Sequence, residues 1–147
     1  MKTLWDDACR REVQDRLSRL DPNAARRWGK MSAPQMVAHL VDSMRMAQGE
    51  IRVPSKNLPL RFTPIKQIVI YWLPFPKGAP TAPALISRPP ADWATECATL
   101  ATMVDRFAER DRAAEWPDHP AFGSLTGAQW GVLVYRHMDH HFRQFGG

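Results

Sequence analysis

Three of the five histidines in the chain lie close together, within residues 137–141. His137 and His141 are four residues apart, so a helix would place their rings one turn apart on the same face. That face is otherwise apolar, with Leu133, Val134 and Met138. A buried imidazole needs a partner for each ring nitrogen, so this pair requires several polar neighbours or a metal ion that accepts a lone pair from each ring.

A stable metal site of nitrogen ligands needs at least three protein donors, so a third ligand must come from another helix. His39 is the candidate, because it lies in a mostly apolar helical pattern near the start of the chain. Taken alone, His39 fits better a core histidine that bonds to a carbonyl or to Asp42. Together with the HxxxH pair, it predicts a divalent metal site formed by His39, His137 and His141.

Residues beside these histidines are candidates for orienting the rings. Asp42 follows His39 by three positions and Gln144 follows His141 by three, so either side chain could hydrogen-bond a free ring nitrogen or a bound water. His140 is rotated by about 100° from His141, which predicts either a supporting position behind the ligands or a place at the rim of the site.

Other reactive groups are few. No P-loop, GxSxG, GxGxxG or HExxH motif occurs. Cys9 and Cys97 are far apart and lack CxxC spacing, which excludes a disulfide framework and a cysteine-rich zinc module. His119 lies in a loop closed by two prolines, and we expect a structural role for it. Three tryptophans near segment ends are candidates for the wall of a ligand cleft: Trp28, Trp72 and Trp116.

Helices must position these side chains, and the apolar spacing predicts four long ones. The second begins with a capping box, in which Ser32 and Gln35 satisfy each other's backbone amides, and ends at Gly49. The fourth begins with a second capping box at Thr126 and Gln129. The four predicted helices cover residues 3–20, 32–49, 92–108 and 126–145.

Nine of the thirteen prolines fall in residues 50–90, between the second and third long helices. We expect one short helix there, over residues 65–72, and a further single-turn helix over residues 22–28. A connection of this length is typical of a crossover that runs from one end of a helical bundle to the other. The predicted fold is therefore all-α, a four-helix bundle with a long proline-rich crossover, formed as a single domain by residues 1–147.

Length and charge restrict the class of protein. A chain of 147 residues buries enough surface to fold without disulfides or a structural metal. The longest apolar run, residues 68–75, is far shorter than the roughly 20 residues that a membrane span needs, and the charged N-terminus does not fit a secretory signal. The net charge of +5 comes from arginines that mostly alternate with acids, so we expect no nucleic-acid partner. A reducing cytoplasm fits the sparse cysteines best.

The positions of His39, His137, His141 and Gln144 resemble those of the DinB-like superfamily of four-helix metal-binding proteins. Within it, the chain resembles a bacterial subfamily of unknown function in four stretches, residues 27–39, 76–83, 119–126 and 137–146. The resemblance implies a divalent ion, usually nickel or zinc, bound by three imidazoles, and often a homodimer. Some relatives resemble thiol-dependent transferases or isomerases that use a low-molecular-weight thiol, and many are described only as metal-dependent hydrolases.

Two functions follow from these observations. In the first, three neutral nitrogen ligands leave coordination positions open, and the ion activates a thiol or water for attack on a small electrophile. The protein would then be a metal-dependent thiol S-transferase or hydrolase with a small-molecule substrate. In the second, the same histidines belong to a noncatalytic metal- or small-molecule-binding module. Thiol consumption that depends on His137 would separate the two.

Overall fold

The computed structural model describes residues 1–147 and contains five α-helices, two single-turn 3-10 helices and no strand. The all-α prediction is therefore confirmed. The 3-10 helices, Pro59–Arg61 and Pro83–Leu85, both lie in the proline-rich crossover. The α-helices are α1 (Asp7–Ser18), α2 (Ala33–Gln48), α3 (Ile65–Tyr71), α4 (Trp93–Phe107) and α5 (Gly127–Gln144).

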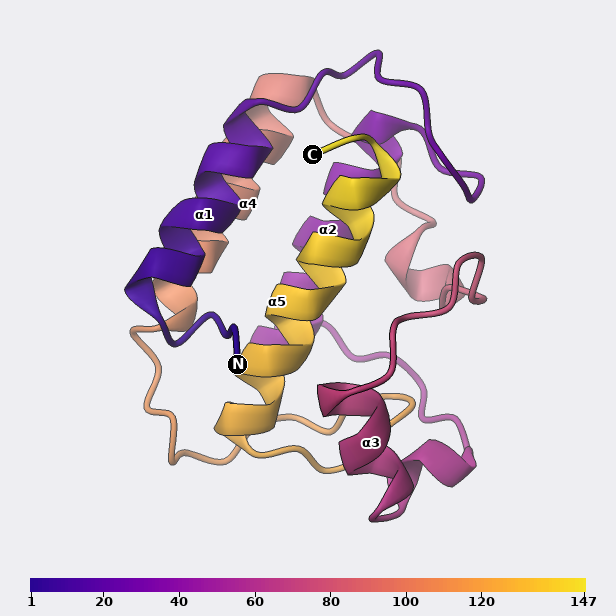
Figure 1. Cartoon of the computed structure of the whole chain (residues 1–147), viewed down its shortest axis with the longest axis vertical. Coiled ribbons are helices and arrows are strands. Elements are labelled where there is room, and N and C mark those ends of the chain that lie inside the picture. Colours follow the sequence, from indigo (N-terminus) through magenta and orange to yellow (C-terminus); the bar gives the residue numbers. More distant parts are fainter.

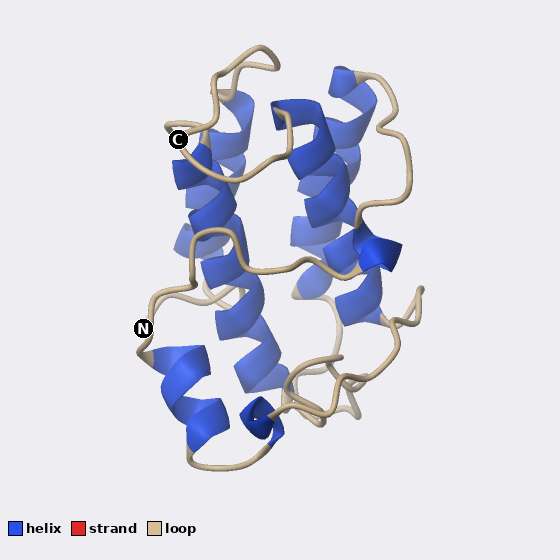
Figure 2. Cartoon of the chain, turned by 90° about the vertical axis from the view of Figure 1, so that its right-hand side faces the viewer, coloured by secondary structure: helices blue, strands red, loops and turns tan.

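The four long helices α1, α2, α4 and α5 lie side by side (Figure 1). α1 contacts α4 and α5, and α2 contacts the same two helices. The short α3 packs on α5 from outside, and the side of the molecule that carries it faces the viewer in Figure 2. Because α2 contacts α5, residues far apart in the sequence can meet between them.

Both histidine-bearing helices begin at the predicted capping boxes. The hydroxyl of Ser32 accepts from the amide of Gln35, whose side-chain oxygen accepts from the amide of Ser32. Thr126 and Gln129 repeat this exchange at the start of α5. These local bonds fix where each helix starts, and therefore which face carries the histidines.

Two of the predicted helical segments differ from the structure. The first long helix begins at Asp7 rather than near residue 3, because the carboxylate of Asp6 accepts from the amide of Ala8 and caps it there. Residues 22–28 form no helix. The carboxylate of Asp21 accepts instead from the amide of Asn23, a local turn that competes with helical hydrogen bonding.

The hydrophobic core runs along the inner faces of the long helices. It includes Trp116, whose ring lies 5.1 Å from that of Phe107 and 5.8 Å from that of Trp5, measured between centroids. Trp116 is therefore part of the core and not the wall of a cleft. None of the helices has the length and apolar character required to cross a bilayer. The largest side chains of the core with almost no exposure include Met36, Leu40, Leu100, Phe107, Trp130, Met138 and Phe142.

Candidate metal centre

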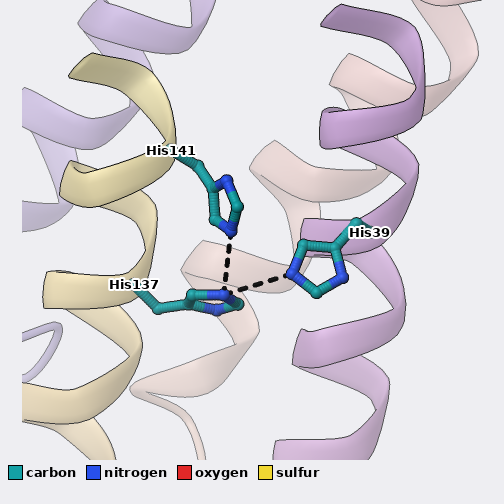
Figure 3. Close-up of side chains that lie close together, drawn as sticks. All are labelled: His39, His137 and His141. Carbon is teal, nitrogen blue, oxygen red and sulfur yellow. Dashed lines mark hydrogen bonds between the residues drawn. The ribbon is translucent and has the colours of Figure 1, made fainter. Parts of the chain in front are cut away.

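The three predicted ligands converge between α2 and α5. Figure 3 shows His39 of α2 and the two histidines of α5 with their rings directed toward one another. The Nε2 atom of His137 lies 3.2 Å from Nε2 of His39 and 3.1 Å from Nε2 of His141. One nitrogen from each ring lies within 4.8 Å of the other two. His39 and His141 are buried, and His137 is partly buried.

The opposite ring nitrogens of His39 and His141 have fixed hydrogen-bond partners. His39 Nδ1 lies 3.1 Å from the carbonyl oxygen of Leu85, and His141 Nδ1 lies 2.9 Å from Oε1 of Gln144. The amide of Gln144 is itself oriented, because its nitrogen donates to the carbonyl of Trp28 at 2.6 Å. Since both partners of the imidazoles are acceptors, each Nδ1 carries the proton and each Nε2 carries a lone pair.

These lone pairs both face Nε2 of His137. A neutral His137 has at most one proton on that nitrogen, and one N–H can satisfy two acceptors only through a shared, weaker hydrogen bond. Burial lowers the pKa of all three imidazoles, to about 3 for His141, so at neutral pH no extra proton fills the space. The three nitrogens therefore share at most one proton, and a cation that accepts a lone pair from each of them would satisfy the whole set.

The spacing also suits a metal ion. Two nitrogens bound to one zinc ion at about 2.0–2.1 Å in tetrahedral geometry lie about 3.3 Å apart. The observed separations of 3.1 and 3.2 Å from His137 are close to this value. The donor chemistry, the spacing and the neutral state of the rings therefore all fit a divalent ion bound by His39, His137 and His141.

Of the predicted orienting residues, Gln144 occupies the expected position and Asp42 does not. The free ring nitrogen of His39 meets the carbonyl of Leu85 and not Asp42. The carboxylate of Asp42 instead accepts from Arg88 Nε at 3.2 Å and from Arg45 Nη1 at 3.1 Å. Two guanidinium groups compete more strongly for a buried carboxylate than a neutral imidazole does.

Arg88 connects the crossover to two long helices. Besides Asp42 on α2, it binds Glu96 on α4, with Nη2 3.2 Å from Oε2 and Nη1 on the other carboxylate oxygen. This ion pair lowers the pKa of Glu96, whose side chain is only 4% exposed. Arg88 follows Leu85 by three residues, so the same ion pairs fix the segment that supplies the carbonyl to His39.

The remaining histidines lie outside the cluster. His140 is half-buried, and its ring centroid lies 5.2 Å from that of His141 without a hydrogen bond to it, so it lies at the rim and does not orient a ligand. His119 has the expected structural role, since its Nδ1 accepts from the amides of Ala121 and Phe122. Burial lowers the pKa of His119 to about 4.

Sequence reasoning missed the carbonyl groups of Leu85 and Trp28 and the cation of Arg88. Backbone carbonyls give no signal in the residue types, and the lengths of the intervening loops do not show where these groups will lie. One available signal was that residues 51–91 contain six cations and no acid, so any ion pair of Arg88 must be made with an acid outside the crossover.

The fold and the cluster together define an all-helical protein with three buried or partly buried histidines arranged as metal ligands. The chain belongs to the family described as protein of unknown function (DUF1569), whose model matches residues 7–146. No curated protein and no solved structure matches the chain.

Proposed function

We propose that this protein is a metal-dependent enzyme in which His39, His137 and His141 hold a divalent ion, nickel or zinc. The observation that carries the proposal is the convergence of two fixed lone pairs on Nε2 of His137. No carboxylate takes part in the cluster, which argues against an iron site that activates oxygen.

The bound ion would supply a Lewis acid that lowers the pKa of a thiol or water brought to it. The protein's own contribution is to hold the ligands in the required tautomers. Leu85 keeps the proton of His39 on Nδ1, and Gln144 does the same for His141. The expected reaction is attack by the activated thiol or water on a small electrophile, as in a thiol S-transferase or a hydrolase.

The resemblance to the DinB-like superfamily supports this proposal from the sequence. The four long helices and the long crossover between α2 and α4 are compatible with the four-helix bundle of that superfamily. On the same basis we propose a cytoplasmic protein that forms homodimers, acts on a small molecule with a low-molecular-weight thiol, and does not bind nucleic acid.

Metal loading tests the site itself. Metal-free protein is titrated with Zn²⁺ and Ni²⁺ by calorimetry, and elemental analysis of untagged protein gives the ion acquired in cells. We expect about one ion per chain, and a loss of affinity of at least about tenfold in His137→Ala. His140→Ala is the matched control, because it removes a neighbouring imidazole of α5 outside the cluster. Equal affinity of the His137→Ala variant and the wild type would refute the site.

Thiol consumption tests catalysis. Metal-loaded protein is incubated with several low-molecular-weight thiols and small electrophiles, and the loss of free thiol is followed. Consumption that requires the ion and disappears in His137→Ala supports the enzyme. If the protein binds metal but neither consumes thiol nor hydrolyses the electrophile, the result favours a noncatalytic binding module over an enzyme.

A further inference from the structure

A cleft of about 340 Å³ opens along the side of α5 that carries Arg136 and His140. Its lining comes from the loop before α2, from the segment that follows α3 and from α5. Phe75, in the second of these, has its ring centroid 6.5 Å from that of His137 and 6.1 Å from that of His140. The volume lies in the lower part of the range of small-molecule sites. None of the three proposed ligands lines the cleft, but the ring of Phe75, which does, lies near that of His137.

Aromatic rings form much of the lining. Trp28, Trp72 and Phe75 all border the cleft, so two of the three tryptophans that were candidates for a cleft wall line this one. Trp72 is 76% exposed, although a side chain of this size buries a large apolar area when it is covered. The uncovered rings provide flat apolar surface for a bound molecule.

The charges in the cleft are mainly positive and only partly neutralised. Asp139 is its one acid, and this carboxylate already binds Arg16 at 2.8 Å and Arg143 at 3.1 Å. Lys77 and Arg136 have no carboxylate within ion-pair distance. The cleft therefore retains two cations without an anionic partner.

Both cations lie against aromatic rings of the lining. The Lys77 ammonium lies 4.6 Å from the centroid of Trp28, and the Arg136 guanidinium lies 5.0 Å from that of Phe75. Arg136 is also held in place by backbone carbonyls at the end of α3, including that of Val69 at 3.0 Å. A ring beside a cation presents apolar and positive surface at adjacent points.

We propose that this cleft binds a small organic anion, a carboxylate or phosphate joined to a flat apolar group. The anionic end lies at Lys77 and Arg136, and the flat group lies against Trp72 and Phe75. The inference rests on the proposed function, since it assigns the substrate or cosubstrate class of the three-histidine centre. It requires no metal for binding, so it can be tested apart from the metal site.

The test uses metal-free full-length protein and three probes. 2-Naphthoate carries a flat ring and an anion, 2-naphthylmethanol carries the ring without charge, and inorganic phosphate carries charge without the ring. Binding is measured by calorimetry and by the shift of tryptophan fluorescence. We expect 2-naphthoate to bind most tightly of the three, because only this probe uses both the rings and the cations.

Two substitutions and one control locate the binding. Lys77→Gln is expected to weaken 2-naphthoate about threefold to fivefold and to leave 2-naphthylmethanol unchanged. Trp72→Ala is expected to weaken both naphthyl probes about fivefold. Lys56→Gln removes the same charge from an exposed position outside the cleft and is expected to change neither affinity.

These binding measurements test the proposed anion site independently of the metal site. Loss of 2-naphthoate affinity in Lys77→Gln but not in Lys56→Gln supports the cleft, even if the protein binds no zinc. Three results would refute the proposed anion site. They are equal affinity for the charged and neutral naphthyl probes, equal effects of the two lysine substitutions, and no saturable binding at millimolar concentration. Zinc binding in the metal titration would still stand in these cases.

Discussion

His39 donates its Nδ1 proton to the carbonyl oxygen of Leu85, at a distance of 3.1 Å and across 46 positions of the sequence. Leu85 ends the second 3-10 helix of the crossover. Because this bond keeps the proton on Nδ1, it directs the lone pair of Nε2 toward His137. The proline-rich crossover is therefore part of the histidine centre and not only a connection between helices.

Substitution of Arg88 should destabilise the protein, because this residue fixes the crossover near Leu85. Arg88→Met would leave the buried carboxylates of Asp42 and Glu96 without their shared cation. Removal of one partner from a buried ion pair costs about 3 kcal/mol or more. We expect a loss of about 3 kcal/mol in the free energy of unfolding, measured by urea denaturation at neutral pH.

Two further variants control this result. Arg26→Met removes an exposed arginine without a side-chain partner and should change stability by less than about 0.5 kcal/mol. Adding Glu96→Gln to Arg88→Met should recover part of the loss, because a neutral amide is less costly to bury than a carboxylate. If Arg88→Met unfolds at the same urea concentration as the wild type, the ion pairs do not hold the crossover.

Gln144 should set the metal affinity without being a ligand. Gln144→Ala removes the acceptor that holds the proton of His141 on Nδ1, so the ring loses its fixed tautomer and orientation. Loss of such a supporting group typically lowers metal affinity about 10- to 100-fold. Competition with a chelator of known affinity measures the effect. Gln14→Ala, at a half-buried glutamine of α1 whose side chain donates to Asp105 and not to a histidine, should leave the affinity unchanged.

The absence of a side chain at Gly29 leaves room for the amide of Gln144. A Cβ atom at Gly29 would lie 2.5 Å from Nε2 of Gln144, which is too close for both groups to stay in place. Gly29→Ala should therefore displace Gln144 and weaken zinc binding about tenfold, although residue 29 lies on neither histidine-bearing helix.

A matched glycine separates this clash from backbone strain. Gly29 has a φ of +78° and Gly78 a φ of +80°, and a Cβ at Gly78 would contact nothing within 4 Å. Both alanine variants should lose about 1 kcal/mol of stability, because L-residues disfavour positive φ. Only Gly29→Ala should lose zinc affinity. A similar loss in Gly78→Ala would attribute the effect to strain in the loops.

The local parts of this structure were predictable and the long-range partners were not. The capping boxes at Ser32 and Thr126 involve residues three positions apart, so the sequence alone is enough to place the starts of α2 and α5. HxxxH spacing placed His137 and His141 on one face for the same reason.

Asp42 shows why the hydrogen-bond partner of His39 could not be predicted from spacing alone. Its spacing from His39 is correct for a hydrogen bond, but Arg88 comes from 46 residues away and binds the carboxylate more strongly. Contacts of this kind depend on how a loop with nine prolines folds back, and no periodic pattern describes such a loop. Leu85 was missed for the same reason, since it contributes a backbone carbonyl whose position only the folded crossover defines.

The metal-free protein should lose stability as the pH falls below about 6.5. Burial lowers the pKa of His119 to about 4 and that of His141 to about 3. Their unfolded pKa is about 6.5, so in acid the unfolded chain binds protons that the folded chain does not. The contribution of these two neutral histidines to the free energy of unfolding is therefore complete above about pH 6.5 and decreases as the pH falls toward 4.

His119 allows this pH dependence to be measured at one residue. At about pH 5 a histidine with such a shift contributes about 2 kcal/mol less to stability than at neutral pH. His119→Asn removes the titrating group and keeps an acceptor for the amides of Ala121 and Phe122. Urea denaturation of the metal-free wild type and variant, near pH 7 and near pH 5, should show a smaller loss in the variant, by about 2 kcal/mol. If both proteins lose the same free energy of unfolding, the acid sensitivity comes from other groups, and the ring of His119 exchanges protons more freely than its burial implies.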